Sequence, residues 1–395
     1  MSKWQPVKLG DIASNIQTGP FGSQLHQSDY SEIGTPVVMP KDLVDGKISE
    51  QSIARVEASH VKRLAKHKIQ NGDILYSRRG DVGRCAYAGK EESGWLCGTG
   101  CLRVTIDESH AFPKFIFYQL QTSQSVGWVE KHAVGSTMLN LNTSILSNVP
   151  VSLPPLEVQR KIADILSAYD DLIENNRKQI KLLEEAAQRL YKEWFIDLRF
   201  PGHENTPIID GIPAGWRRGS ITDISVCFDG KRIPLSTSER NNQNKIYPYY
   251  GAASLMDYVE DYIFDGIYLL FGEDGTVISR DGSPILQYVW GKFWVNNHAH
   301  IFQGTSCFST EFLYMLCKHL NVSDVVTGVA QPKISQGRLN AKKILIPQKN
   351  LVLKYTNVTK EMFKAIRLYN DQIILLTETR NRLLPKLMTG ELEVE

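Results

Sequence analysis

The chain has 395 residues, of which 42% are hydrophobic and 9% aromatic, and its formal net charge is +2. This composition is too rich in core-forming residues for a disordered chain, and the length suits two ordinary domains plus a connecting element. A net charge so close to zero excludes a strongly basic arm, so any contact with nucleic acid would depend on local basic patches.

The N-terminal sequence MSKWQPVKLGD has no apolar signal core. The longest apolar runs, such as Ile373 to Leu376, are far shorter than the roughly 20 residues that a membrane helix needs. We therefore expect a cytoplasmic protein. The six cysteines form no CxxC pair, so the sequence predicts neither a zinc knuckle nor a disulfide framework, and we expect reduced residues that serve in packing.

The first segment, residues 1–153, has the pattern of a mixed α/β domain. It opens with Trp4 and the short helix-like sequence KLGDIAS. Strand and turn signals follow in TPVVMP, NGDILYSRRGDVG and GWLCGTGCLRV, each punctuated by Gly or Asn-Gly. The sequence FPKFIFYQLQTS then predicts an amphipathic helix.

The most regular stretch comes next, from Pro155 to Leu198. Apolar side chains recur there in alternating steps of four and three residues, with one polar residue in the series. The positions are Ile162, Leu166, Tyr169, Ile173, Asn176, Ile180, Leu183, Ala187, Leu190 and Trp194. A period of 3.5 residues is the seam of a coiled coil, so the stretch predicts one long helix packed against another helix. Pro154 before it and Pro201 with Gly202 after it delimit the helix.

Beyond a linker rich in Pro and Gly, the pattern of the first domain starts again. Trp216 with ITDIS corresponds to Trp4 with LGDIA, while FDGIYLLFGEDG, KFWVNNHAHIFQ and TEFLYMLCKH correspond to QNGDILYSRRGD, GWLCGTGCLRV and PKFIFYQLQT. Later pairs, such as Gly135 with Gly328, differ by 193 positions. The second half is therefore a shorter copy of the first, and two copies are too few for a solenoid.

The repeat includes the long helix, because a second seam runs from about Asn350 to Met388. Its positions are Met362, Ile366, Tyr369, Ile373, Leu376, Leu383 and Leu387. Pairing the two helices buries both seams most simply, and the equivalence of the halves favours an antiparallel pair with approximate twofold symmetry and a domain at each end. Asn176 aligns with Tyr369, so the seams differ, and a polar group there could fix the register. The alternative is that each helix packs onto its own domain as core.

The sequence thus predicts an α/β (α+β) fold with a pseudo-twofold internal repeat, in which two long antiparallel helices form an intramolecular coiled coil. The expected parts are a first globular domain at 1–153, a central helix at 154–200, a linker at 201–214, a second domain at 215–347 and a C-terminal helix at 348–395.

Several signatures of catalysis are missing from this sequence. No proline precedes an aspartate, as in a nuclease core, and there is no Pro-Pro-Tyr or Pro-Pro-Phe, P-loop, GxGxxG or GxSxG motif. His298 and His300 could share one face of a strand and hold a metal, but no third ligand lies near in sequence, so packing or polar contacts are favoured. We predict no catalytic residue, no metal ligand and no cofactor bound by this chain.

Candidate binding residues occur at matching places in both copies. Arg78, Arg79 and Arg84 lie in a glycine-flanked loop, and arginine suits phosphate and the O6 and N7 atoms of guanine. Two equivalent polar loops, at 135–142 and 328–335, could bond phosphates or base edges. The further candidates are Ser136, Thr137, Asn140, Lys231, Arg232, Tyr249, Tyr250, Gln331 and Lys333. The alternative for a basic loop is an ordinary solvated surface.

With these features combined, the sequence resembles the specificity (S) subunit of type I restriction-modification enzymes. The resemblance spans essentially the whole chain. It depends on the order of domain and long helix, on GSTMLNLNTSILSNVPVSLPPLEVQRKIADILSAYDDLIENNRKQI with its echo GVAQPKISQGRLNAKKILIP, on IPAGW, and on LLPKLMTGEL near the C-terminus.

The resemblance implies two target recognition domains that each read half of a bipartite DNA site through the major groove, and helices that set the spacer. It implies a non-catalytic subunit within a phage-defence complex. Two methyltransferase subunits would bind S-adenosylmethionine and methylate adenine N6, and two motor-nuclease subunits using ATP and Mg could join them. The outer-face residues Arg160, Lys161, Glu184 and Glu185 are the expected methyltransferase docking surface.

Three other interpretations stay open from the residues themselves. One is a stand-alone DNA-binding module without methyltransferase partners, a second is a coiled-coil scaffold whose globular ends bind proteins, and a third is an enzyme with an unrecognised site. The recognised bases do not follow from the sequence, because no short code relates residues to bases.

Overall fold

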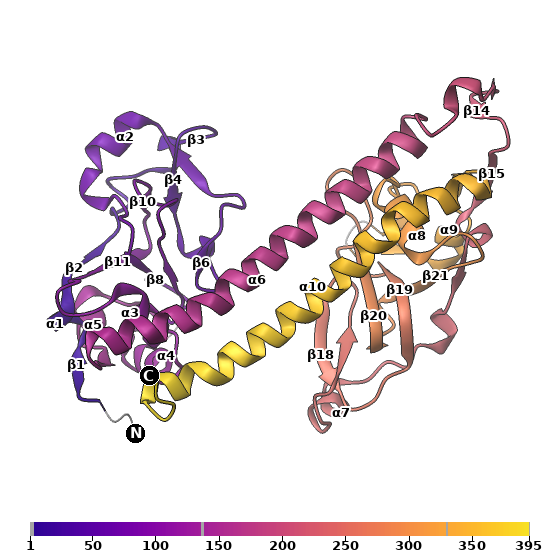
Figure 1. Cartoon of the computed structure of the whole chain (residues 1–395). Helices are drawn as coiled ribbons and strands as arrows, with labels where there is room; N and C mark the ends of the chain where they lie inside the picture. Colours follow the sequence, from indigo (N-terminus) through magenta and orange to yellow (C-terminus); the bar gives the residue numbers. More distant parts are fainter. Residues whose placement is uncertain (1–3, 136–137, 329–330, 395) are drawn as a thin grey trace. The chain divides into compact units, whose positions relative to one another are not determined.

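The computed structural model describes residues 4–135, 138–328 and 331–394, and the chain divides into two compact units (Figure 1). Unit 1 comprises Met1–Glu174 with Ile373–Glu395, and unit 2 comprises Asn175–Gln372. Each unit contains one globular domain and one portion of each long helix. The domain boundaries expected from the sequence separate domains from helices instead, and they stay a prediction.

Two four-stranded sheets build the domain of unit 1. One has the antiparallel order β2 (Ala13–Thr18), β11 (Cys101–Ile106), β8 (Ile74–Ser77), β9 (Cys85–Tyr87). The other has the order β10 (Leu96–Cys97), β4 (Thr35–Val38), β7 (Ala54–Val56), β3 (Tyr30–Ser31). Two small antiparallel pairs join β1 (Pro6–Lys8) to β12 (Pro150–Ser152) and β5 (Leu43–Val44) to β6 (Lys47–Ile48).

Short helices cover these sheets. They are α1 (Leu9–Ile12), α2 (Ala58–Arg63), α3 (Pro113–Leu120), α4 (Ser123–His132) and α5 (Thr143–Ser147), with 3-10 turns at Gln27–Asp29, Pro40–Asp42 and Ala65–His67. The predicted amphipathic helix is α3, which begins at a proline and is buried except at the half-buried Lys114. The side chain of Asn142 caps α5 by accepting a 2.8 Å hydrogen bond from Ile145 N.

A six-stranded sheet dominates the domain of unit 2. Its order is β16 (Ser225–Cys227), β21 (Ala299–Gly304), β19 (Phe264–Gly272), β20 (Leu286–Val295), β17 (Tyr247–Tyr250), β18 (Leu255–Val259). Smaller pairs join β15 (Arg217–Ser220) to β24 (Lys343–Ile346), β22 (Val326–Thr327) to β23 (Lys333–Ile334), and, within the predicted linker, β13 (Ile208–Ile209) to β14 (Ile212–Pro213). The helices are α7 (Thr237–Asn241), α8 (Thr310–Lys318) and α9 (Gln336–Asn340), with 3-10 turns at His203–Asn205, Ile221–Asp223 and Asp229–Lys231.

The internal repeat is visible in the strand pairing of the two domains. The order β2-β11-β8 in unit 1 recurs as β16-β21-β19 in unit 2. The pair β1 and β12 recurs as β15 and β24, and the helices α3 and α5 recur as α8 and α9. Pro150 and Lys343, which begin β12 and β24, are 193 positions apart, as the sequence repeat predicts. The second domain is therefore built on the same framework as the first.

The two long helices are α6 (Leu156–Tyr191) and α10 (Lys349–Thr389). Helix α6 ends earlier than the predicted Leu198, because a π-helical turn at Lys192–Ile196 interrupts the regular hydrogen bonding and Leu198 has a left-handed backbone, with φ of 59°. Helix α10 continues through Pro385, four residues before its end. Among the described residues, no helix has the length and apolar character needed to span a membrane.

Portions of the two helices pack against each other in each unit, and they run antiparallel. In unit 1, Asp170 of α6 pairs with Arg380 of α10, while Ile162, nearer the start of α6, shares a core cluster with Leu387, nearer the end of α10. In unit 2, Asn176 Nδ2 donates to Gln372 Oε1 at 3.1 Å, and Tyr355 Oη donates to the carbonyl of Ala187 at 2.9 Å.

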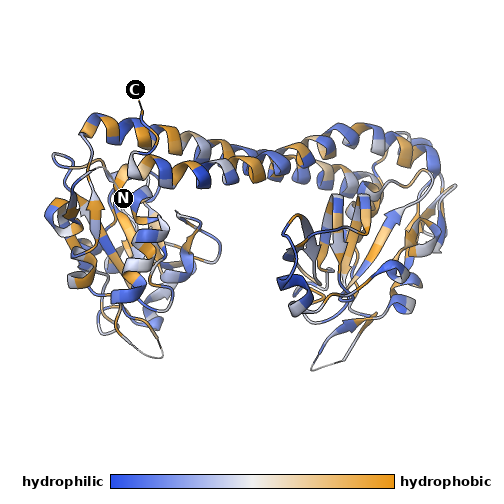
Figure 2. Ribbon diagram, turned by 90° about the horizontal axis from the view of Figure 1, so that it is seen from below, coloured by the Kyte–Doolittle hydropathy of each residue, from blue (hydrophilic) through white to orange (hydrophobic). Residues whose placement is uncertain are grey.

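The predicted seam is the face on which the helices are buried. Ile162, Leu166, Ile173, Asn176 and Ile366 are each at most 5% exposed. The remaining predicted seam positions are buried or half-buried, namely Tyr169, Ile180, Leu183, Ala187, Leu190, Trp194, Met362, Tyr369, Ile373, Leu376, Leu383 and Leu387. Figure 2 shows hydrophilic and hydrophobic residues alternating along both helices, as such a seam requires.

Both interpretations of the long helices hold in part, because each helix also contributes to a domain core. Ile162, Ala163 and Leu166 belong to the core cluster of unit 1, together with Phe115 of α3. Ala187 and Tyr191 belong to the core cluster of unit 2, together with residues of α8 and α10. The domains are therefore joined to the helices by continuous apolar cores, not by flexible linkers.

Candidate nucleic-acid interface

In the first domain, the arginine loop and the polar loop at 135–142 lie side by side. Arg78 and Arg79 follow β8 directly, and the chain turns back at Gly80, where φ is 75°. Leu141 N donates to the carbonyl of Arg78 at 2.8 Å, and Gly80 N donates to the carbonyl of Leu139 at 3.0 Å. Between these two bonds, Arg79 and Asn140 face each other as an isolated antiparallel bridge. Residues 59 to 63 positions apart thus form one surface.

In the second domain, the equivalent segments are joined by the same hydrogen bonds. Ile334 N donates to the carbonyl of Glu273 at 2.9 Å, and Gly275 N donates to the carbonyl of Pro332 at 3.0 Å. Asp274 and Lys333 face each other across the resulting bridge. Lys333 lies 193 positions after Asn140, the offset of the sequence repeat. We call the pairs Arg79/Asn140 and Asp274/Lys333 the first and second bridge.

Each bridge lies at the base of a tight hairpin that begins with a glycine. Gly135 has a φ of 129°, and a Cβ added there would lie 2.2 Å from the carbonyl oxygen of Met138. Gly328 has a φ of 81°, and an added Cβ would lie 2.5 Å from the carbonyl oxygen of Gln331. Both positions therefore require glycine. Ser136 and Thr137, predicted as contacts, lie outside the described residues.

The two bridges carry different charges on this shared backbone. In the first, Arg79 is exposed, and Arg78 is half-buried with its guanidinium 5.8 Å from the ring centre of Phe21. In the second, Lys333 Nζ lies 3.2 Å from both Glu273 Oε1 and Asp274 Oδ1, and its side chain is 48% exposed. A basic surface in one domain thus corresponds to a mixed, ion-paired surface in the other.

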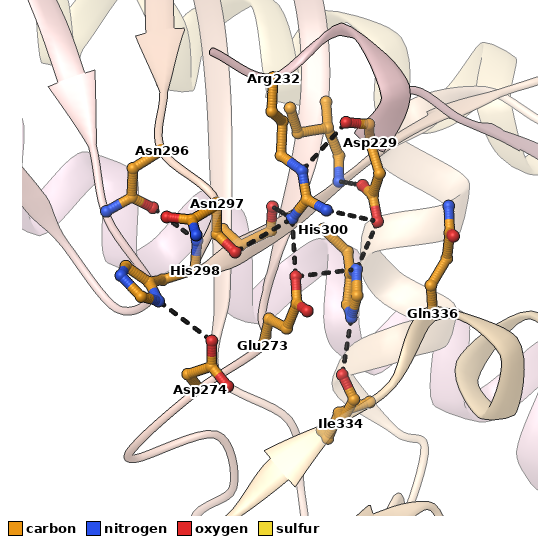
Figure 3. A network of polar contacts seen from close by, with 12 residues as sticks. Asp229, Arg232, Glu273, Asp274, Asn296, Asn297, His298, His300, Ile334 and Gln336 are labelled. Carbon is orange, nitrogen blue, oxygen red and sulfur yellow. Dashed lines mark hydrogen bonds and ion pairs between the residues drawn. The ribbon is translucent and has the colours of Figure 1, made fainter. Parts of the chain in front are cut away.

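Beneath the second bridge lies a buried polar network, shown in Figure 3. His300 of β21 is fully buried, with Nδ1 2.5 Å from Asp229 Oδ2 and Nε2 2.8 Å from the carbonyl oxygen of Ile334. Arg232 Nη1 lies 2.7 Å from Glu273 Oε2, and its Nη2 lies 3.4 Å from Asp229 Oδ2. The network fixes the hairpin to the sheet through Ile334.

The geometry indicates a charged His300. A carbonyl oxygen only accepts, so Nε2 carries a proton, and the Asp229 carboxylate requires a second proton on Nδ1. Burial alone would lower the pKa of His300, but the bonds to Asp229 and Ile334 and the charge of Glu273 outweigh it and raise this pKa above its ordinary value. Burial would raise the pKa of Asp229, but the bond to His300, the charges of His300 and Arg232 and the bond from Ile301 N together outweigh it and lower that pKa.

Three possible metal ligands meet in this network. Atoms of Asp229, Glu273 and His300 lie within 4.8 Å of one another. The guanidinium of Arg232 pairs with both carboxylates, however, and His300 uses both ring nitrogens on protein partners. Arg232 thus provides the positive charge that a metal ion would bring, so we assign the cluster to positioning. His298 lies outside it, with Nδ1 3.0 Å from Asp274 Oδ2.

The other predicted contact residues differ in accessibility. Arg84 is exposed and paired with Asp81 at 2.7 Å, while Lys231 and Gln331 are exposed and Tyr250 is half-buried. Two predictions need correction. Tyr249 is only 1% exposed, because it points inward from β17 and its hydroxyl contacts Leu235 N at 3.1 Å. Arg232 is 16% exposed and is held by the buried network, so it supports the surface instead of forming it.

The predicted docking residues are partly engaged within the chain. The guanidinium of Arg160 lies 5.0 Å from the ring centre of Phe112, and Glu184 Oε2 lies 3.6 Å from Lys318 Nζ. Lys161 pairs with Glu157 at 3.4 Å and Glu185 with Lys181 at 4.0 Å, both along the surface of α6. Arg160 is the exposed member of the set, and Lys161, Glu184 and Glu185 are half-buried.

These features define a class of protein: two equivalent recognition domains, each with a polar hairpin fixed to its sheet, combined with two long antiparallel helices. Residues 1–185 and 213–384 match the type I restriction modification DNA specificity domain, and the chain belongs to this family. It is therefore a type I restriction-modification specificity subunit with two DNA-recognition domains, which confirms the resemblance and the fold class inferred from the sequence.

Two curated relatives match this chain over most of their length. The chain is 27% identical over 414 residues to the type I restriction enzyme MjaIX specificity subunit of Methanocaldococcus jannaschii, an alignment covering 99% of this chain and 94% of that one. It is 25% identical over 355 residues to the type I restriction enzyme EcoprrI specificity subunit of Escherichia coli, covering 87% and 83%.

A solved structure shares the fold. The crystal structure of the S subunit of the type I restriction-modification system from M. genitalium aligns with a TM-score of 0.62 at 16% sequence identity, covering 98% of this chain and 96% of that one. At this identity the comparison supports the architecture alone.

Proposed function

We propose that this chain is the non-catalytic subunit that selects the DNA site of a type I restriction-modification complex, with each domain reading one half of a bipartite site through the major groove. The observation that supports this proposal most directly is the pair of bridges, which have the same backbone hydrogen bonds and different polar side chains. A common scaffold with different donors and acceptors is what reading two unlike half-sites requires.

The long helices are proposed to set the distance between the half-sites. Helix α6 has 36 residues and α10 has 41, and at about 1.5 Å per residue they extend roughly 54 and 60 Å. Two reading elements meet the same face of B-DNA when they are about 34 Å apart, or a multiple of that distance. A continuous helix holds such a spacing better than a flexible linker would.

Two methyltransferase subunits are the proposed partners on the helices. Large apolar side chains are exposed at repeat-equivalent positions, with Ile165 and Val358 37% and 50% exposed, and Leu182 and Leu375 58% and 65% exposed. Each pair is 193 positions apart. Equivalent apolar positions on two helices suit two copies of one partner, and exposed apolar residues are typical of interaction surfaces.

The chemistry is assigned to partner subunits. Methyltransferase subunits would bind S-adenosylmethionine and methylate adenine N6, and up to two motor-nuclease subunits would use ATP and Mg in the cytoplasm. The net charge of +2 supports this division, because a chain with so little excess positive charge would share phosphate neutralisation with its partners.

Single-molecule methylation mapping of genomic DNA tests the proposal. Cells that carry this gene with its methyltransferase should show a bipartite motif with modified adenines on both strands, and deletion of the gene should abolish the modification. A motif that persists after deletion, or a chain that associates with no methyltransferase, would contradict it.

A further inference from the structure

The exposed cation lies on a different one of the two paired segments in each bridge. In the first bridge the cation is Arg79, on the segment that follows β8, and the facing residue Asn140 is neutral. In the second the cation is Lys333, on the hairpin strand β23, and the facing residue Asp274 is acidic. The backbone bonds on either side of each bridge are the same, so only the side chains distinguish the two sites.

We propose that each bridge is the specificity-determining pair of its domain, and that the second bridge reads a G·C base pair on both of its bases. This inference rests on the proposed function and deepens it. Lys333 would donate to O6 or N7 of guanine, and Asp274 would accept from the N4 amino group of cytosine. These two groups lie next to each other in the major groove, as the two side chains do on the bridge.

The surroundings of Lys333 hold its ammonium group without exhausting its donors. Glu273 Oε1 and Asp274 Oδ1 each lie 3.2 Å from Nζ, and the ammonium group has three hydrogens. The side chain remains 48% exposed, whereas Glu273 is 12% and Asp274 20% exposed. Two carboxylates therefore hold the ammonium group of Lys333 in place, while one of its N–H donors stays available.

The carboxylates of Glu273 and Asp274 are anchored by other side chains, which favours a role in recognition over that of an ordinary surface ion pair. Glu273 is fixed by Arg232, and Asp274 Oδ2 lies 3.0 Å from His298 Nδ1. An ordinary exposed ion pair contributes little to stability. Here both carboxylates are held from below, so the geometry of the bridge is set before DNA arrives, which lowers the entropic cost of binding.

The first bridge has different chemistry. Arg79 presents a planar guanidinium suited to guanine or phosphate, whereas Asn140 is half-buried and its amide oxygen is covered. With no carboxylate facing Arg79 across the bridge, this site adds net positive charge. We therefore infer that the first domain contributes more to the salt dependence of DNA binding, and the second contributes more to base discrimination.

An exchange of bridge chemistry tests the inference. In the full chain with its methyltransferase, Asp274→Arg and Lys333→Asn together give the second domain the side chains of the first bridge. Binding sites are selected from a randomised duplex pool for the wild type and the variant. We expect the wild type to require G·C at one position of the second half-site, and the variant to lose that preference by about tenfold or more, with the first half-site and the spacer unchanged.

A matched control uses another ion pair of unit 2. Lys192 Nζ lies 2.8 Å from Asp197 Oδ1 at the end of α6, with side chains 56% and 34% exposed. Lys192→Asn with Asp197→Arg should leave both half-sites unchanged. If the bridge variant is misfolded by circular dichroism, Lys333→Gln decides, because it removes the positive charge and shortens the side chain only slightly.

The outcomes separate the two proposals. An unchanged second half-site in a folded bridge variant, or in Lys333→Gln, overturns the inference while the proposed function stands. A second half-site without a required G·C pair in the wild type overturns it equally. If the wild type selects no bipartite site at all, the proposed function itself fails.

Discussion

At the scale of single residues, the two domains hold their hairpins by different forces. Leu102 and His300 occupy the same place in the repeated sheet, since Leu102 faces Tyr76 and His300 faces Phe271, the penultimate residues of β8 and β19. Leu102 is part of an apolar core, whereas His300 joins a charged network. The second hairpin therefore depends on the protonation of His300, whereas Leu102, at the same place in the first domain, does not titrate.

The pH dependence of stability follows from the raised pKa of His300. A group whose pKa is higher in the folded state stabilises fully below its unfolded pKa, about 6.5 for histidine, and this contribution is lost as pH rises through the folded pKa. We expect the urea midpoint of the wild type to fall between pH 6 and 9, and His300→Gln to flatten that decline. Tryptophan fluorescence at several pH values provides the measurement.

The same substitution tests the network directly. Removing His300 leaves Asp229 with Arg232 as its charged partner at 3.4 Å, so we expect His300→Gln to destabilise the chain by about 3 kcal/mol at pH 6. A variant as stable as the wild type, with an unchanged slope against pH, would show that the ring is neutral in the folded chain.

At the scale of elements, the hairpins depend on their glycines. We expect Gly135→Ala to weaken selectivity for the first half-site only, and Gly328→Ala for the second only, because each added Cβ meets a carbonyl oxygen at a positive φ. Site selection from a randomised duplex pool measures both effects.

Helix glycines in the same domains serve as controls. Gly127 of α4 and Gly337 of α9 have no atom within 4 Å of an added Cβ. Alanine at either position should leave selectivity intact, since it favours the helix by up to about 1 kcal/mol. Loss of both half-sites in either hairpin variant would contradict the independence of the two domains.

One carboxylate connects the first domain to both long helices. Asp170 of α6 accepts from Tyr118 of α3 at 2.6 Å and pairs with Arg380 of α10. Asp170→Asn removes the charge while keeping the shape, and we expect a loss of about 1–3 kcal/mol in unfolding free energy by urea titration. Glu378→Gln, which affects an exposed pair with Arg382 at 3.8 Å, should cost less than about 0.5 kcal/mol. Equal effects would show that Asp170 contributes no more than a surface charge.

Local patterns in the sequence predict these elements unevenly. The heptad spacing predicts the seam on both helices, because burial on one face imposes that period. The end of α6 does not follow, since the π-helical turn at Lys192–Ile196 depends on packing with the second domain's core through Phe195. In β17, Tyr249 is buried while Tyr247, Pro248 and Tyr250 are half-buried, so the strand does not form the surface aromatic cluster expected from its sequence.

The sequence alone did not predict the buried polar network. Asp229 lies in a 3-10 turn, Glu273 directly follows β19 and His300 lies in β21, and no motif spacing relates them. The repeat does offer a signal, because Gly80 and Gly275 occupy the same turn, and this register places Glu273 and Asp274 where the first copy has Arg78 and Arg79. The hydrogen-bond register of the structure was needed to choose this alignment of the two copies over neighbouring ones.

At the scale of the whole molecule, the repeat is the basis of the proposed division of labour. Two domains with one framework and different bridges would read different half-sites, and the two continuous helices would fix the interval between them. The exposed apolar positions repeat with the same offset as the bridges, so recognition and assembly would share one symmetry. The spacer length should then depend on the helices alone.

Deleting one heptad from each helix tests this central claim most directly. Removing residues 172–178 and 372–378 takes out the hydrogen-bonded Asn176 and Gln372 together, and it keeps the Asp170–Arg380 pair and the 3.0 Å bond from Trp290 to Asp371. Each helix shortens by about 10 Å, the length of about three base pairs. Methylation mapping should show both half-sites unchanged and a spacer about three base pairs shorter. An unchanged spacer, or altered half-sites, would contradict the account.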